Sequence, residues 1–207
     1  MKKCVAFALC GSFCTFEKAL GAAQRLLDDG WTLLPVMSAN AAGMDTRFGT
    51  AASFRERLTR MTGQPPVTTI AGAEPLGPQA LAEALIIAPC TGNTLAKLAL
   101  GITDTPVTMA AKSLLRIGRP VLIALSTNDG LAASMQNIGR LLNTKNVYFV
   151  PFGQDDPLHK PAGLQSDFSQ LEAGLLCALR KEQLQPVLTQ AGKGTDAAAP
   201  DAAARTV

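Results

Sequence analysis

The chain has 207 residues, a formal net charge of +3 at pH 7, 47% hydrophobic residues and 17% charged residues. This composition favours a single compact domain with a sizeable core, and it excludes a wholly disordered chain. The small charge and the lack of a basic run argue against a nucleic-acid partner, and no apolar run approaches the roughly 18–20 residues of a membrane span. We therefore expect a cytoplasmic protein with neither a nucleic-acid nor a membrane partner.

The first predicted unit is strand, helix, strand. Residues 4–9 are apolar without a charge, which is typical of a strand buried on both faces. Helical spacing of apolar residues follows over 16–27, with Thr15 as the expected cap and Gly30 as the stop. Residues 31–37 then predict a second strand. A right-handed crossover between parallel strands is the default for such a unit.

The loop at residues 10–15 joins the first strand to the first helix. Gly11 allows a ligand to approach the backbone closely, Ser12 offers a hydroxyl, and the helix start attracts phosphate. The loop lacks the G-x-G-x-x-G dinucleotide fingerprint, so alone it is a weak signal. Cys10 and Cys14 are interpreted as buried apolar residues, with reactive thiols as the alternative.

The middle of the chain leads to a second candidate corner. We expect a helix with a polar face over 51–61, a short strand over 67–70 and a short helix over 79–83. Residues 84–88 predict a fully buried strand, and a helix follows it. Asn93 and Lys97 are four residues apart, so their side chains leave the same helix face. Thr91 or Asn93 acting only as a helix cap is an equally good reading of the local sequence.

The remaining elements continue the same alternation. Pro106 opens a helix, and residues 121–125 form a strand that ends at the polar corner 126–130, where Asn128 faces a ligand or simply makes a turn. A helix over 135–142 precedes the last strand, 147–150. The prolines of 151–161 predict a loop outside the sheet. A closing helix spans 166–185, so the domain covers residues 1–185, and residues 186–207 form a disordered tail.

Metal chemistry finds little support. His159 is the only histidine, and the five cysteines show no C-x-x-C spacing. Neighbouring Asp155 and Asp156 are more typical of a solvated loop than of a metal site. No metal is expected, and the odd cysteine count argues against a disulfide framework.

The corner after the central strand carries a resemblance. Its sequence, Pro89-Cys90-Thr91-Gly92-Asn93-Thr94, resembles the Pro-Ala-Ser-Ala-Asn-Thr motif of the homo-oligomeric flavin-containing cysteine decarboxylase family. Lys97, Gly101 and Asp104 fall where that family has them. Residues 91–112, 124–130 and 148–161 resemble one branch of the family in particular. The general flavoprotein resemblance covers roughly residues 3–150.

The alternation of predicted strands and helices indicates a three-layer, Rossmann-like or flavodoxin-like α/β fold with a mostly parallel sheet of about five or six strands. The resemblance implies bound flavin mononucleotide (FMN) and a homo-oligomer, either a trimer or a multiple of one. By resemblance the flavin contacts are Gly11, Ser12, Phe13, Ser38, Thr91, Asn93, Thr94 and Asp104. The candidates for holding substrate carboxylates are Asn93, Lys97 and Asn128.

The matching branch implies that the chain is one component of an oxidoreductase. Together with an A subunit that binds a pyridine nucleotide, it would oxidise a dihydrodipicolinate-type precursor, a pyridine dicarboxylate, in the mother cell of a sporulating bacterium. Two alternatives stay open. The chain is a non-catalytic partner with a vestigial flavin site, or it is a flavin-dependent decarboxylase or flavin prenyltransferase. Decarboxylation is disfavoured, because no histidine lies near residues 51–61 and 126–128 read Ser-Thr-Asn where the decarboxylases have Pro-Met-Asn.

Overall fold

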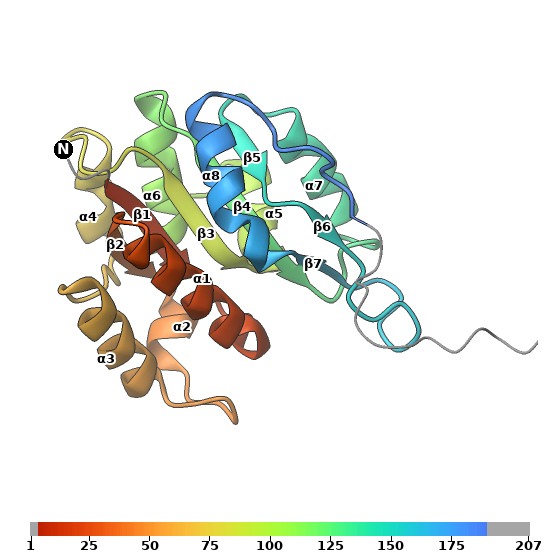
Figure 1. The fold of residues 1–207 in the computed structure, drawn as a ribbon, viewed down its shortest axis with the longest axis horizontal. Helices are drawn as coiled ribbons and strands as arrows, with labels where there is room; N and C mark the ends of the chain where they lie inside the picture. The colour runs from red at the N-terminus through yellow and green to blue at the C-terminus, as the bar shows by residue number, and fades with distance from the viewer. Residues whose placement is uncertain (1–3, 190–207) are drawn as a thin grey trace, which may run out of the picture.

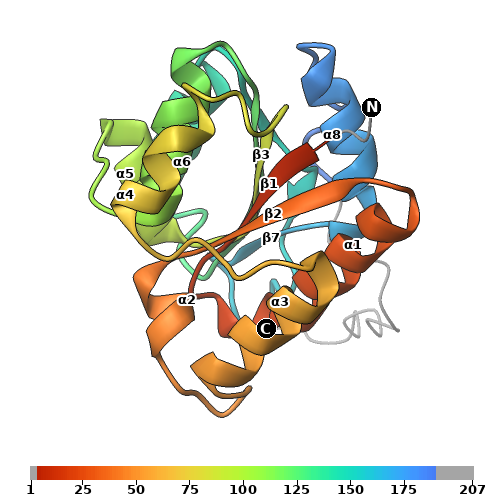
Figure 2. The same ribbon diagram turned by 90° about the vertical axis from the view of Figure 1, so that its left-hand side faces the viewer.

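The computed structural model describes residues 4–189, which form one sheet between two layers of helices (Figures 1 and 2). The strand order is β2-β1-β3-β4-β7-β6, with β5 also paired to β4. The first five strands run parallel: β1 (Cys4–Leu9), β2 (Thr32–Met37), β3 (Leu85–Cys90), β4 (Val121–Thr127) and β5 (Val147–Phe149). Their carboxyl ends therefore meet at one edge of the sheet, as the predicted α/β fold requires.

Helices cover both faces of the sheet (Figure 2), and in the described part of the chain four pack against each face. One face packs against α1 (Phe16–Asp28), α2 (Ala39–Gly43), α3 (Ala51–Thr62) and α8 (Leu171–Leu179). The other face packs against α4 (Ile70–Ala73), α5 (Gly92–Leu100), α6 (Pro106–Arg116) and α7 (Met135–Leu142). The three-layer fold expected from the sequence is confirmed.

Strand β1 shows why the central strands are apolar throughout. Its side chains alternate between the two cores: Phe7 and Leu9 join the α1 side, whereas Ala6 and Ala8 join the α6 side. All four are fully buried. Burial of a side chain such as Phe7 contributes roughly 1.5–3 kcal/mol relative to exposure. A polar residue at any of these positions would face a helix rather than water.

A small hairpin extends the sheet beyond the parallel strands. Strands β6 (Phe152–Gly153) and β7 (Leu164–Ser166) pair antiparallel, and β7 also pairs antiparallel with the last two residues of β4. Strand β5 occupies the same edge of β4 earlier, along Val121–Ile123. The buried hydroxyl of Ser166 accepts a hydrogen bond from the Leu125 N–H at 2.8 Å and donates to the Val150 carbonyl at 3.1 Å. The hairpin is therefore fixed to the carboxyl end of β4.

This hairpin corrects two expectations. The prolines predict that the segment 151–161 lies outside the sheet, but Phe152 and Gly153 pair within it. The sheet consequently has seven strands in the described part of the chain, not five or six. The closing helix is also shorter than the predicted 166–185, since α8 follows a 3₁₀ turn at Phe168–Gln170.

Two short elements before β3 also differ from the expectation. Of residues 67–70, only Val67 makes a bridge, to Val36, and Ile70 already begins α4. None of residues 79–83 is helical: residues 79 and 80 lie in a turn, where Ala80 has a φ of 49°. The preceding Gly77 packs directly on α6, where an added Cβ would lie 2.0 Å from the Ser113 carbonyl oxygen.

Helices α1 and α8, from opposite ends of the chain, lie side by side on one face (Figures 1 and 2). The Arg25 guanidinium donates to the Phe168 carbonyl at 3.0 Å. The Trp31 indole N–H donates to Glu172 Oε1 at 3.3 Å. The segment around α1 is thus held by hydrogen bonds to the segment that contains α8.

The end of the described chain runs past the predicted domain boundary at residue 185. The Phe152 N–H donates to the Val187 carbonyl at 3.0 Å, and the Thr189 N–H donates to the Phe152 carbonyl at 2.9 Å. The rest of the predicted tail lies outside the described residues, so the tail stays a prediction. Among the helices at 4–189, none is long and apolar enough to span a membrane.

Candidate functional site

A cavity of about 390 Å³ opens where the carboxyl ends of β1 and β4 meet the β3–α5 corner. This volume lies within the range of roughly 300–1,000 Å³ typical of small-molecule sites. Four segments line the cavity: the β1–α1 connection, the β3–α5 corner, the end of β4, and the β6–β7 hairpin. The lining residues that the sequence analysis assigns to ligand binding are Gly11, Ser12, Thr91 and Asn128.

Three hydroxyls form a cluster on one wall of this cavity. The Ser12 and Ser126 hydroxyl oxygens lie 2.8 Å apart. Thr15 donates to the Ser12 carbonyl at 2.8 Å, and its hydroxyl lies 3.3 Å from that of Ser126. Thr15 and Ser126 are buried, so the cluster is held in place by the surrounding fold. Since a hydroxyl proton can rotate toward an acceptor, such a cluster suits an oxyanion placed next to it.

The helix start beside these hydroxyls adds to their effect. A 3₁₀ turn at Phe13–Thr15 leads directly into α1. The first N–H groups of a helix have no partners within the helix, and its positive end attracts anions. An added Cβ at Gly11 would meet only ordinary contacts of 3.5 Å, to Asn40 and Phe13. Packing within the chain therefore does not require glycine at position 11. A ligand that approaches the backbone closely would require it.

The β3–α5 corner is packed tightly against the end of β4. Thr91 caps α5, and its hydroxyl accepts a hydrogen bond from the Thr94 N–H. A Cβ on Gly92 would lie 2.8 Å from oxygens of Thr127, Asp129 and Ser134. Glycine at position 92 is therefore required by the approach of these polar side chains. The cap interpretation of Thr91 is confirmed, and its flavin contact stays a prediction.

The predicted residues on α5 lie outside the cavity lining. Lys97 forms an ion pair with Asp104 at 2.8 Å. The hydrogen bond from Lys97 is the largest cause that holds the pKa of Asp104 below its ordinary value. Asn93 is exposed on the first turn of the same helix. Within this chain Asp104 therefore ties the loop after α5 back to the helix, and Lys97 has a partner of its own.

Three further predicted flavin contacts have structural roles. Phe13 packs against Phe16 with ring centroids 5.1 Å apart. Ser38 caps α2 by accepting the Ala41 N–H at 3.2 Å. The buried Thr94 hydroxyl accepts from Thr91 at 3.2 Å. These contacts neither require nor prevent a ligand, and the flavin roles of Phe13, Ser38 and Thr94 stay predictions.

Two cysteines at the ends of β1 and β3 are buried, and a third lines the cavity. Burial raises the pKa of the Cys10 thiol to about 11 and that of Cys90 well above its ordinary value, so both are protonated at neutral pH. Cys10 is thus the buried residue that the sequence predicts. Cys14 is not, because it is exposed and lines the cavity.

The sequence analysis missed several residues of the cavity. Lys18 lies three residues after Thr15 in the helix, and this spacing could have indicated a shared face. Ser126 directly follows the predicted strand 121–125, so the same rule that selected Asn128 applied to it. Asp155, Lys160 and Gln165 reach the cavity on the hairpin. No local signal points to these three, because antiparallel pairing with β4 brings them there.

The loop of the hairpin shows no metal centre. Asp156 accepts a hydrogen bond from the His159 ring, 2.9 Å away, and this bond is the main reason that the pKa of Asp156 lies below its usual value. Among residues 4–189, no group of three or more histidine, cysteine or acidic side chains is arranged to hold a metal ion.

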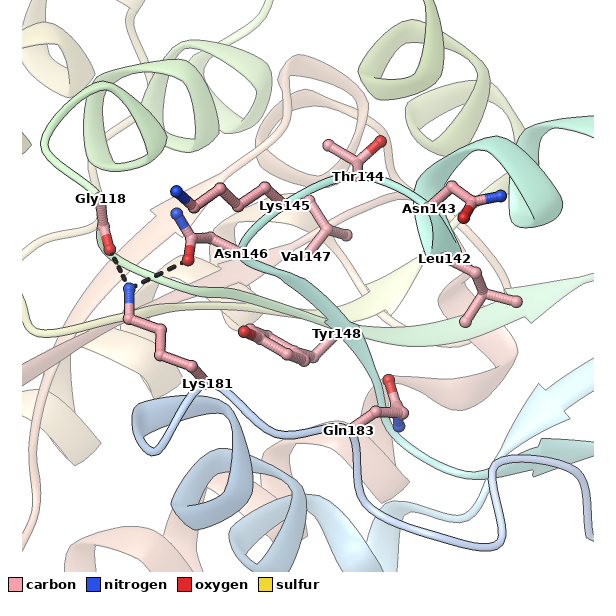
Figure 3. A pocket seen from close by; sticks show the side chains of 10 residues that line it. All are labelled: Gly118, Leu142, Asn143, Thr144, Lys145, Asn146, Val147, Tyr148, Lys181 and Gln183. Carbon is pink, nitrogen blue, oxygen red and sulfur yellow. Dashed lines mark hydrogen bonds between the residues drawn. The ribbon is translucent and has the colours of Figure 1, made fainter.

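A second, larger cavity of about 700 Å³ lies at the other end of the sheet, around the start of β5 (Figure 3). Figure 3 shows Lys181 bridging two neighbouring turns: its ammonium group donates to the Gly118 carbonyl and, at 3.0 Å, to Asn146 Oδ1. The lining of this larger cavity includes none of the predicted site residues. Ligands of open parallel sheets bind at the carboxyl ends of strands, so the smaller cavity remains the candidate site.

The chain belongs to the flavoprotein family, whose family model matches residues 1–163. Within that family it is similar to the B subunit of dipicolinate synthase from Bacillus subtilis (strain 168), with 41% identity over 194 residues, 94% of this chain and 97% of the relative. The family assignment made from residues 89–94 is confirmed.

Solved structures agree with this assignment. The crystal structure of the dipicolinate synthase B subunit from Bacillus halodurans C has a TM-score of 0.84 at 40% identity, over 93% of this chain and 100% of that one. DmrB of Burkholderia xenovorans, solved in complex with FMN and described as a cubic protein cage for redox transfer, has a TM-score of 0.65 at 20% identity, over 84% of this chain and 93% of that one. The likeness to DmrB shows the fold alone.

Proposed function

We propose that this chain is the FMN-binding component of a dipicolinate synthase. It acts with the dipicolinate synthase A subunit to oxidise a dihydrodipicolinate-type precursor to dipicolinate, in the cytoplasm of the mother cell of a sporulating bacterium. The strongest support for the reaction is the similarity to the B subunit of that enzyme over nearly the whole chain. When bound, FMN supplies a ring that can accept a hydride as the substrate becomes aromatic.

The observation that carries flavin binding is the hydroxyl cluster at the start of α1. Ser12, Thr15 and Ser126 present hydroxyls to a cavity that also receives the positive end of a helix. A phosphate monoester carries close to two negative charges at neutral pH and needs several donors. The residues present therefore fit the phosphate of FMN, which agrees with the role that the resemblance gives to Gly11 and Ser12.

The remaining roles follow from what the chain itself offers. In the part that the structure describes, Asp155 is the only carboxylate in the cavity lining, so the cavity has no obvious pair of acid and base. We infer that the chain orients substrate against the flavin with Asn93, Lys97 and Asn128, once a second protomer or another protein chain completes the site. Homo-oligomers, as trimers or multiples of trimers, are consistent with the cage that DmrB forms.

The need for an A subunit follows from the loop at 10–15. It lacks the glycine pattern of a dinucleotide site, so this chain has no evident means of exchanging hydride with a nicotinamide. The test is turnover by the purified chain with and without the A subunit, measured by the ultraviolet absorbance of the pyridine product. Product formation by this chain alone with a nicotinamide cofactor would contradict the division of roles.

Flavin binding is tested separately by the visible spectrum of the purified protein and by titration of apo-protein with FMN. We expect a double change, Ser12→Ala with Ser126→Ala, to weaken FMN binding roughly tenfold or more, since a hydrogen bond to a charged group contributes about 1.5–3 kcal/mol. Ser169→Ala is the matched control, because its hydroxyl bonds only Asp167, outside the cavity. If the wild type, the double variant and Ser169→Ala bind FMN with equal affinity, the phosphate does not bind in this cavity.

One observation favours a second candidate. Lys97, a predicted substrate contact, is already paired with Asp104. A non-catalytic partner with a vestigial flavin site would show the same pairing. Full product formation by the A subunit in the absence of this chain would favour that reading.

A further inference from the structure

The cations of the candidate cavity differ from those that the sequence suggests. Lys97 lies outside the lining and is neutralised by Asp104 at 2.8 Å. Lys18 and Lys160 do line the cavity, and they come from different segments, the first turn of α1 and the β6–β7 hairpin. The fold, rather than sequence spacing, thus brings the two residues to one cavity.

Neither lysine has a strong anionic partner. The Lys18 ammonium donates to the side-chain oxygen of Gln165 at 3.1 Å, and that amide carries no charge. Lys160 lies 3.6 Å from Asp155 Oδ2, with roughly half of its side chain exposed. A close charge-assisted hydrogen bond measures about 2.7–2.9 Å, so the Lys160–Asp155 pair is a loose one. The cavity lining therefore carries two positive charges and one loosely paired carboxylate.

The main chain that carries Lys160 is held firmly. The Lys160 N–H donates to the Asp156 carbonyl at 2.8 Å, and the Gly163 N–H donates to the Lys160 carbonyl at 2.9 Å. The Leu131 N–H donates to the Ala162 carbonyl at 2.9 Å, which attaches the loop to the turn after β4. A lysine on so well anchored a loop loses less conformational entropy when it binds a ligand.

The loop also lies beside the hydroxyl cluster. Gln165, which holds Lys18, pairs through its backbone with Ser126 in the register of β7 against β4. Ser126 in turn contacts Ser12. Hydroxyls, helix start and both lysines therefore line one cavity, and every one of these groups favours an anion.

We propose that Lys18 and Lys160 form a two-lysine clamp for an oxyanion of the ligand that occupies this cavity. Gln165 and Asp155 hold the two side chains while no ligand is present, and the oxyanion takes their place on binding. The inference deepens the proposed function, on which it rests for the ligand. The oxyanion is either the phosphate of FMN or a carboxylate of a pyridine dicarboxylate, and both carry the same negative oxygens.

Titration calorimetry with three probes separates the two sources: FMN, riboflavin, which lacks the phosphate, and dipicolinate, which lacks the flavin. Lys18→Gln and Lys160→Gln are compared with Lys112→Gln, a change at an exposed lysine on α6 that does not line the cavity. Circular dichroism confirms folding. Lys160→Arg should keep most of the affinity, because it retains the charge.

If the clamp binds phosphate, each Lys→Gln change weakens the affinity for FMN about tenfold, equivalent to 1.4 kcal/mol, and leaves the affinity for riboflavin unchanged. If the clamp binds a carboxylate, each Lys→Gln change weakens the affinity for dipicolinate by that factor. The affinities for FMN and riboflavin then stay unchanged. In either case the loss shrinks as salt rises, because exposed charges are screened. Asp155→Asn should bind the affected probe at least as tightly as the wild type.

The proposal is overturned if both Lys→Gln proteins bind all three probes like Lys112→Gln. A wild-type protein that binds none of the three overturns both the clamp and the proposed function. A wild-type protein that binds FMN normally while the lysine changes have no effect overturns only the clamp.

Discussion

The contact between Gly130 and Leu164 holds the hairpin on the end of β4. The substitution Gly130→Ala, which adds one methyl group, tests this contact. A Cβ added at Gly130 would lie 2.5–2.7 Å from three carbon atoms of the Leu164 side chain, one of them its own Cβ. Leu164 is 5% exposed and belongs to the core beneath α7. Since its Cβ is fixed to the backbone of β7, a change of rotamer cannot relieve the clash.

The expected cost of Gly130→Ala is that of overpacking a core, about 1–3 kcal/mol. For a domain of this size each kcal/mol lowers the melting temperature by roughly 2–4 °C. The melting temperature should therefore fall by about 2–12 °C. Circular dichroism at 222 nm measures it under one buffer and one protein concentration.

The matched control is Gly139→Ala. Gly139 lies inside α7, and an added Cβ there meets no atom within 4 Å. Because alanine is the better helix former by about 0.8–1.0 kcal/mol, this change should raise the melting temperature slightly. If Gly130→Ala melts within about 1 °C of the wild type, the packing of Leu164 on the β4–α7 turn is not what the structure describes.

Two further changes probe interactions on either side of the site. Lys97→Met should raise the pKa of Asp104 toward its ordinary 3.8, as measured by carboxyl NMR titration. The Asp104 pKa is depressed in the folded chain, so the pair stabilises the fold above pH 3.8 and the gain is lost as pH falls through the lowered value. An unchanged pKa would show that the pair is absent in solution. Ser166→Ala should cost about 1–3 kcal/mol in urea unfolding, because it leaves the buried Leu125 N–H and Val150 carbonyl without their bridge. A loss below about 0.5 kcal/mol would contradict that bridge.

The sequence predicts the parallel part of the fold well because its signals are local. Residues 4–9 and 85–90 are uninterrupted apolar runs, and the structure buries almost all of them. Thr105 and Pro106 indicate the start of α6, and the structure shows a full capping box there. Such patterns depend on neighbours in the chain, so they can be read without knowing the tertiary contacts.

The hairpin was not predictable in the same way. Prolines at 151, 157 and 161 indicate a loop, yet the two paired residues of β6 lie between them. Pairing of β7 with β4 depends on Gly130 and Leu164, which are far apart in sequence. The half of the candidate site that comes from strand ends could therefore be predicted, and the half that comes from the hairpin could not.

Lys97 illustrates the limit of helical spacing as a guide to function. The four-residue interval from Asn93 indicates a shared helix face, but it gives no information about the loop that follows α5. Gly101 ends the helix with a φ of 71°, and the chain then returns Asp104 to Lys97. The pairing of a charge depends on such a return, which no periodicity within the helix encodes.

The contact between α1 and α8 has a consequence for synthesis on the ribosome. Glu172, which binds the Trp31 indole, is translated 141 residues later. At about 5–20 residues per second, the apolar flank of α1 waits roughly 7–28 s for its covering helix. During that interval the nascent chain exposes apolar surface of the kind that chaperones bind, and slower translation would lengthen the exposure in proportion.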